Sequence, residues 1–168
     1  MAVLLIAEHN NKNLKPFTLN AITAASKIDP DVHVLVVGSG CENVAKEVAG
    51  LGRKSWAVAV DVGDSAAVEA SVVKILEDTG GVNILVNNYG TAEPSSWDDE
   101  DSSAWFKAFE KNVFSAERIT KGLLPIMKKN QWGRVINLGT TGSTRPNPQN
   151  PAYYSSKGAL ATMTVSLA

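Results

Sequence analysis

A tyrosine and a lysine late in the chain have the spacing that acid–base chemistry requires. Tyr153 and Lys157 are four residues apart, so a helix places both side chains on one face, one turn from each other. An unperturbed phenol titrates near pH ~10, and a neighbouring ammonium group favours the phenolate. Thr140, which follows a short apolar run, is placed to polarise a carbonyl oxygen with its hydroxyl. A proton donor, a cation and a second hydroxyl around one oxygen suit the reduction of a ketone by hydride.

The spacing alone also fits an exposed tyrosine and lysine on a solvated helix, and the surrounding sequence favours the catalytic interpretation. The letters INLGTTG, followed by a loop and then AYYSSKGAL, resemble the active-site region of the short-chain dehydrogenase/reductase family. The resemblance implies that Tyr153 and Lys157 are the catalytic tyrosine and lysine. It also implies that Thr140 stands in place of the catalytic serine, with Ser143 as the alternative if the loop is shifted.

The same resemblance implies site residues further upstream. Asp61 and Val62 match the position at which the family's aspartate accepts a hydrogen bond from the adenine amino group. Asn88 and Gly90 belong to the letters NNYG, where the family has NNAG lining the cofactor cleft; the bulkier tyrosine is expected to narrow that cleft. Asn112 matches the asparagine that holds a water molecule in the family's proton relay.

Together these matches imply an NAD(P)-dependent oxidoreductase that moves hydride to or from a carbonyl or alcohol substrate. In it Tyr153 transfers the proton, Lys157 lowers the pKa of the tyrosine and contacts the nicotinamide ribose, and Thr140 orients the carbonyl. A charged residue after the second strand usually separates NAD from NADP. The sequence Gly38-Ser39-Gly40-Cys41 supplies none, so both cofactors stay open.

The start of the chain departs from the family. Where the family carries a TGxxxGxG turn for the cofactor pyrophosphate, this chain reads EHNNKNLKP. The letters MAVLLIAEHNN through VHVLVVGSGCENVAKE resemble the amino terminus of the electron transfer flavoprotein alpha subunit instead. A recombined chain is therefore expected, with a flavoprotein-like unit at about 1–45 and a dehydrogenase-like part at about 46–168 within a single domain.

Two further interpretations stay open. The missing glycine turn, and the absence from this sequence of the family's C-terminal region with its substrate loop, fit a non-catalytic α/β scaffold that keeps relic active-site residues. The flavoprotein resemblance would instead imply flavin or AMP binding. Gly38-Ser39-Gly40 lacks the third glycine of a phosphate-binding fingerprint and is interpreted as a tight turn.

Apolar runs alternate with amphipathic segments along the whole chain. The expected strands are 1–7, 32–37, 55–62, 82–88 and 135–138, and the expected helices are 17–28, 41–51, 66–78, 102–129 and 152–168. Repeated strand–helix–strand units imply right-handed parallel crossovers. The sequence therefore predicts an α/β fold: a three-layer, doubly wound parallel sheet of Rossmann-like type, with about five strands in the order 3-2-1-4-5.

Composition narrows the classes of partner. A formal net charge of −1 gives no reason to expect nucleic acid or an anionic membrane. Cys41 is the sole cysteine, and neither His9 nor His33 is interpreted as a ligand, so no metal site is expected. No run has the length of a membrane span or the pattern of a signal peptide, and a cytoplasmic location is expected. A homo-oligomer through the helices at 102–129 and 152–168 is implied by the family resemblance.

Overall fold

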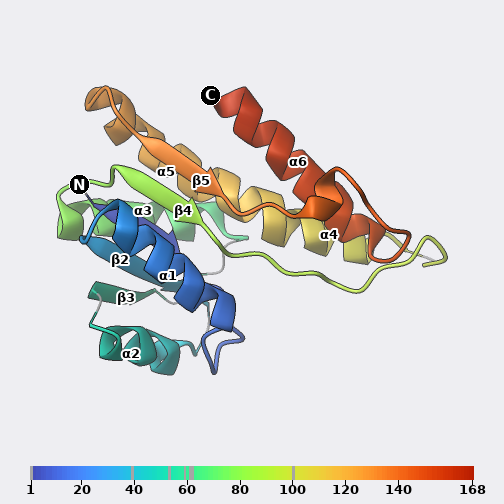
Figure 1. Cartoon of the computed structure of the whole chain (residues 1–168), viewed down its shortest axis with the longest axis horizontal. Helices are drawn as coiled ribbons and strands as arrows, with labels where there is room; N and C mark the ends of the chain where they lie inside the picture. The colour runs from blue at the N-terminus through green and yellow to red at the C-terminus, as the bar shows by residue number, and fades with distance from the viewer. Residues whose placement is uncertain (1, 39, 53, 59, 61–62, 100) are drawn as a thin grey trace.

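The sheet has the predicted order. The computed structural model describes residues 2–168 except 39, 53, 59, 61–62 and 100. Within this part of the chain, parallel strands form one continuous sheet in the order β3-β2-β1-β4-β5 (Figure 1). The strands are β1 (Val3–Ile6), β2 (Val32–Val37), β3 (Lys54–Val58), β4 (Ile84–Asn87) and β5 (Arg134–Asn137). The predicted doubly wound, three-layer fold is confirmed.

The first strand lies at the centre of this sheet. Val3 pairs with Val32 of β2 on one side and with Ile84 of β4 on the other. The N-terminal segment is therefore an integral part of the fold, as a recombined unit would have to be.

Helices cover both faces of the sheet. α1 (Pro16–Ile28) and α2 (Glu42–Gly50) pack on one face, and α3 (Ser65–Thr79) and α5 (Ser115–Lys129) pack on the other. Because successive side chains of a strand point to opposite faces, the apolar run of β1 serves both cores. Val3 and Leu5 join the first core, while Leu4 and Ile6 join the second.

The predicted helix 102–129 contains an irregular turn. It consists of α4 (Ser103–Phe109), a π-helical turn (Glu110–Phe114) and α5. The last helix, α6 (Pro151–Leu167), packs against α4 and the π-helical turn and lies beside β5 at the edge of the sheet (Figure 1). Among the residues that the structure describes, no helix combines the length and the apolar character needed to cross a membrane.

Side-chain hydrogen bonds connect the last two strands of the sheet, β4 and β5, to the helices α5 and α6. The amide of Asn87, at the end of β4, donates to Thr120 Oγ1 of α5 at 3.1 Å and to Asn137 Oδ1 of β5 at 2.8 Å. Asn137 Nδ2 donates in turn to Thr164 Oγ1 of α6 at 2.9 Å. This series fixes α5 and α6 relative to the carboxyl ends of β4 and β5.

We expect Asn87→Ala to lower the free energy of unfolding by about 1–3 kcal/mol, because Thr120 and Asn137 would lose a hydrogen-bond partner in a largely buried place. Urea denaturation followed by circular dichroism measures the change. The matched control is Asn43→Ala, since Asn43 is exposed on α2. Equal stability of the two variants would contradict the structural role of Asn87.

Candidate functional site

One asparagine joins the segments that carry the predicted catalytic residues. Asn112 lies in the π-helical turn and is 1 % exposed. Its Oδ1 accepts from the Thr91 backbone N–H at 2.9 Å, and its Nδ2 donates to the Thr91 carbonyl at 2.9 Å and to Ser156 Oγ at 3.1 Å. The loop after β4 and the first turns of α6 are thus fixed to the same side chain. Single π-helical turns are frequently found at functional sites.

The predicted catalytic lysine is buried beside this asparagine. Lys157 is 4 % exposed, and its Nζ donates to the Leu138 carbonyl at 2.8 Å. A Cβ atom at Gly90 would lie 2.9 Å from Lys157 Nζ and 2.6 Å from Asn112 Oδ1. A side chain at position 90 would therefore have to displace the Asn112 amide, the Lys157 ammonium or both.

A carboxylate lies within electrostatic reach of this lysine. Burial lowers the pKa of Lys157, and the negative charge of Glu8 opposes that shift. Burial likewise raises the pKa of Glu8, while Lys15 and Lys157 oppose the rise. Glu8 follows β1, in the segment where the family has its glycine turn, and no motif in the sequence associates it with Lys157.

The tyrosine lies on the same helix as this lysine, and the two candidate hydroxyls belong to the loop between β5 and that helix. Tyr153 is half-buried, one turn before Lys157 on α6, and its ring centroid lies 5.4 Å from that of Tyr154. Thr140 Oγ1 accepts from the Gly142 backbone N–H at 3.3 Å, so this hydroxyl caps the 3-10 turn Thr141–Ser143. Ser143 Oγ is buried and has no hydrogen-bond partner among the described residues.

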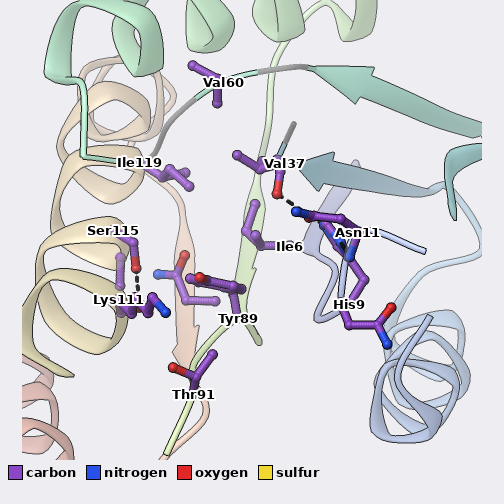
Figure 2. Close-up of a pocket in the computed structure, with 14 residues that line it drawn as sticks. Ile6, His9, Asn11, Val37, Val60, Tyr89, Thr91, Lys111, Ser115 and Ile119 are labelled. Atoms are coloured by element: carbon purple, nitrogen blue, oxygen red, sulfur yellow. Dashed lines mark hydrogen bonds between the residues drawn. The ribbon is translucent and has the colours of Figure 1, made fainter. Parts of the chain in front are cut away.

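A cavity of about 560 Å³ opens at the carboxyl ends of the strands (Figure 2). The loop after β1 and the end of β2 form one wall, and the π-helical turn and α5 form the opposite wall. Tyr89 and Thr91, which follow β4, lie between the two walls (Figure 2). The lining comprises Ile6, His9, Asn10, Asn11, Val37, Gly38, Val60, Asn87, Tyr89, Thr91, Lys111, Ser115, Ala116 and Ile119.

The predicted cofactor residues that the structure describes do not line this cavity. Asn88, Gly90 and Lys157 are all absent from its lining. Asn88 Nδ2 instead donates to Thr18 Oγ1 of α1 at 3.3 Å, which places its amide on the opposite face of the sheet from that of Asn87. Asp61 and Val62 lie outside the described residues. Tyr89, which was expected to narrow the cofactor cleft, does line the cavity and packs against the core under α3 and α5.

His9 holds the loop that stands in place of the glycine turn. Its Nε2 lies 3.0 Å from the Val37 carbonyl, which can only accept, so Nε2 carries the proton and Nδ1 is free to accept. Nδ1 accepts from the Asn11 backbone N–H at 3.0 Å, and Asn11 adopts a positive φ of 68°. Both ring nitrogens are therefore used within the protein. A Cβ at Gly38 would lie 3.1 Å from His9 Cε1 and 2.7 Å from Asn11 Oδ1, so β2 meets this loop closely.

The backbone of this loop is satisfied internally. Each backbone N–H from Asn10 to Lys15 donates to an acceptor in the chain. The acceptors are, in order, the Asn13 carbonyl (3.2 Å), His9 Nδ1 (3.0 Å), Asn10 Oδ1 (3.1 Å), Asn10 Oδ1 again (2.8 Å), Glu47 Oε2 (3.2 Å) and the Glu8 carbonyl (3.0 Å). A glycine turn works by leaving such groups available to phosphate oxygens. In this chain these six donors are already engaged.

The residues on the two walls of the cavity could not be predicted as site residues from the sequence. His9 and Asn11 form part of one wall and Lys111 part of the other, yet none belongs to a motif that marks a site. Asn11 and Lys111 are ordinary polar residues, and His9 has no second histidine or cysteine near it in sequence. Among the described residues, no group of three or more His, Cys, Asp or Glu side chains is placed to hold a metal ion.

We expect stability to depend on pH through His9. Burial lowers the pKa of His9, while its hydrogen bond to Val37 opposes the shift, so the folded state takes up a proton less readily than the unfolded chain, which does so near pH ~6.5. The free energy of unfolding should therefore fall as the pH is lowered below ~6.5. Urea denaturation between pH 7.5 and 5 should show a smaller fall for His9→Gln. Parallel curves for the two proteins would contradict the prediction.

Comparisons with known proteins give the family. A model of the short chain dehydrogenase family matches residues 21–168. The oxidoreductase UcpA of Salmonella typhimurium is 33 % identical over 136 residues, covering 80 % of this chain and 52 % of that protein. The 3-oxoacyl-[acyl-carrier-protein] reductase FabG of Haemophilus influenzae is 29 % identical over 135 residues, covering 79 % of this chain and 56 % of that protein. The chain thus spans about half the length of these curated relatives.

Solved structures agree with this result. A short-chain dehydrogenase from Streptomyces avermitilis superposes with a TM-score of 0.81 at 26 % identity, covering 100 % of this chain and 60 % of that one. The family match starts inside the segment 1–45, and nothing in these comparisons supports a flavoprotein-like origin for that segment. The family model matches most of the chain, and the fold agrees with that of a solved short-chain dehydrogenase. The chain belongs to the short-chain dehydrogenase family.

Proposed function

We propose that this chain provides the acid–base centre of an NAD(P)-dependent oxidoreductase, which transfers hydride between the cofactor and a carbonyl or alcohol. The observation that carries the proposal is the packing of Lys157 against Gly90 and Asn112, with Asn112 hydrogen-bonded to Ser156 of the same helix as Tyr153. A relative named as a 3-oxoacyl reductase supports a carbonyl substrate class. The proposal covers either NAD or NADP as the cofactor.

A bound nicotinamide dinucleotide would meet two different parts of the protein, the region of Lys157 at one end and the loop after β1 at the other. At the nicotinamide end, the group proposed to contact the ribose is the Lys157 ammonium, which packs against Gly90 and Asn112. The loop Asn10–Lys15 is unlike the family's turn, because its backbone donors are already engaged. When bound, the cofactor would supply or accept the hydride; the protein's own contribution is the movement of a proton.

That proton would move between the Tyr153 phenol and the oxygen of the substrate. Lys157, one helical turn away on α6, would supply the positive charge of this centre. Burial lowers the pKa of Lys157, so the ammonium releases a proton more readily than an exposed lysine. Glu8 opposes that shift and helps to keep the lysine charged. Asn112 is a positioning residue, since it fixes the start of α6 through Ser156.

A second copy of the chain is the proposed protein partner. Large apolar side chains are exposed on the helices that the family resemblance assigns to an oligomer contact: Phe106 is 76 % and Val165 is 79 % exposed. They lie on α4 and α6, and α4 and α6 pack against each other. We also propose a cytoplasmic location, which rests on the sequence expectation alone.

We expect Tyr153→Phe to lower the rate of carbonyl reduction by about 10²–10⁴-fold, the range that a general acid contributes. NADH and NADPH oxidation with a panel of ketones measures this effect. Tyr154→Phe is the matched control, because Tyr154 adjoins Tyr153 and its hydroxyl accepts from Asn147 Nδ2 at 3.1 Å. If both variants and the unmodified chain bind cofactor yet none turns over, the alternative of a scaffold with relic residues is correct.

A second pair of variants identifies the hydroxyl that polarises the substrate. We expect Thr140→Val to reduce kcat by at least about tenfold, because loss of one hydrogen bond in the transition state costs on the order of 1.4 kcal/mol or more. Ser143→Ala should leave kcat within about twofold. The reverse ranking would show that the buried, unpartnered Ser143 hydroxyl turns toward the substrate and that Thr140 serves only as the cap of its turn.

A further inference from the structure

The cavity needs a source of positive charge if it is to hold the pyrophosphate of a dinucleotide. The loop after β1 does not offer its backbone donors from Asn10 to Lys15, because acceptors within the chain already use them. Both nitrogens of His9 are used as well, and burial keeps its pKa below the ordinary value. This wall therefore presents to the cavity the neutral side chains of Asn10 and Asn11 beside the imidazole.

The opposite wall carries a cation. Among the described residues that line the cavity, Lys111 is the one with a full positive charge, and its side chain extends from the π-helical turn on the side facing Asn11 (Figure 2). Its place in the chain is rigid, because the next residue, Asn112, is fixed by three hydrogen bonds. The backbone from which the ammonium extends is therefore anchored beside the cavity.

The ammonium retains capacity for a ligand. Lys111 Nζ donates to Glu93 Oε1, and this bond is the main reason why the pKa of Glu93 lies below its ordinary value. Thr91 Oγ1 donates to the same carboxylate oxygen at 3.1 Å. An ammonium has three N–H donors, so a lysine bonded once within the described structure keeps two for other acceptors. Lys111 is also 37 % exposed, which leaves it accessible from the cavity.

We propose that Lys111 binds the phosphate groups of a nucleotide in this cavity, in place of the backbone donors of a glycine turn. The inference rests on the proposed function and specifies how this chain would recognise its cofactor. Charge-assisted hydrogen bonds to phosphate are stronger than neutral ones, and lysine serves phosphates as a compact point charge. Glu93 then acts as a competing anion that holds the ammonium in place when the cavity contains no phosphate.

The test is a calorimetric titration of the whole chain with ADP and, separately, with adenosine. We expect Lys111→Met to weaken ADP binding by at least about tenfold, the effect of losing about 1.4 kcal/mol of charge-assisted hydrogen bonding. Adenosine binding should be unchanged, because adenosine has no phosphate. The matched control is Lys107→Met: Lys107 lies one turn earlier, is exposed, and does not line the cavity. Its ADP affinity should stay within about twofold.

A second variant, expected to strengthen ADP binding, separates the inference from folding defects, because a misfolded protein would not bind ADP more tightly. Glu93→Gln removes the competing carboxylate, so ADP should bind several-fold more tightly, and this gain should disappear in the double variant with Lys111→Met. Equal ADP affinities of Lys111→Met and the unmodified chain would overturn the inference. If those proteins also reduce ketones in a Tyr153-dependent manner, the proposed function stands without it. If the unmodified chain binds neither ADP nor NADH, both proposals fail together.

Discussion

The arrangement of the site depends on the amide of Asn112. An asparagine inside a helix is ordinarily unfavourable, because its side chain competes for backbone groups. Here that tendency is satisfied by Thr91, whose N–H and carbonyl both bond to the amide, and the remaining amide proton goes to Ser156. The helix opens into a π-helical turn at this residue. Removal of the amide would break the direct bond between this helix and Ser156, and, among the described residues, side-chain hydrogen bonds would then attach α6 to the end of β5 only through Lys157 and Thr164.

A second constraint is the cost of burying charge at this end of the sheet. Lys157 is nearly inaccessible and has a carbonyl, not a carboxylate, as its direct hydrogen-bond partner. The negative charge of Glu8 compensates for part of that burial from a distance. The arrangement stabilises the charged lysine less than a close ion pair would, so its proton remains labile. A tightly paired lysine would be more stable and less useful for moving protons.

The fold could be predicted from sequence more fully than the site. Continuous apolar runs gave the strands, and right-handed crossovers gave their order. The spacing of Tyr153 and Lys157 fixed their shared face because helical geometry is local. In contrast, the contact between Asn112 and Ser156 joins residues 44 positions apart, and helical periodicity continues through the π-helical turn without a visible break. Asn87 and Asn88 illustrate a finer limit: alternation along the strand sends their amides to opposite faces, and the sequence does not show which face holds the cavity.

The closed loop after β1 has a consequence for how this cavity can evolve. A glycine turn adapts to its ligand, whereas a loop whose amides and imidazole are all engaged behaves as a fixed template. Point changes within it disrupt several bonds at once, so selection for a new ligand would act mainly on the facing wall. On that wall Ser115 and Ile119 are buried, whereas Lys111 is partly exposed and can be exchanged without repacking the core. A change of ligand preference would therefore begin at position 111 and not in the loop after β1.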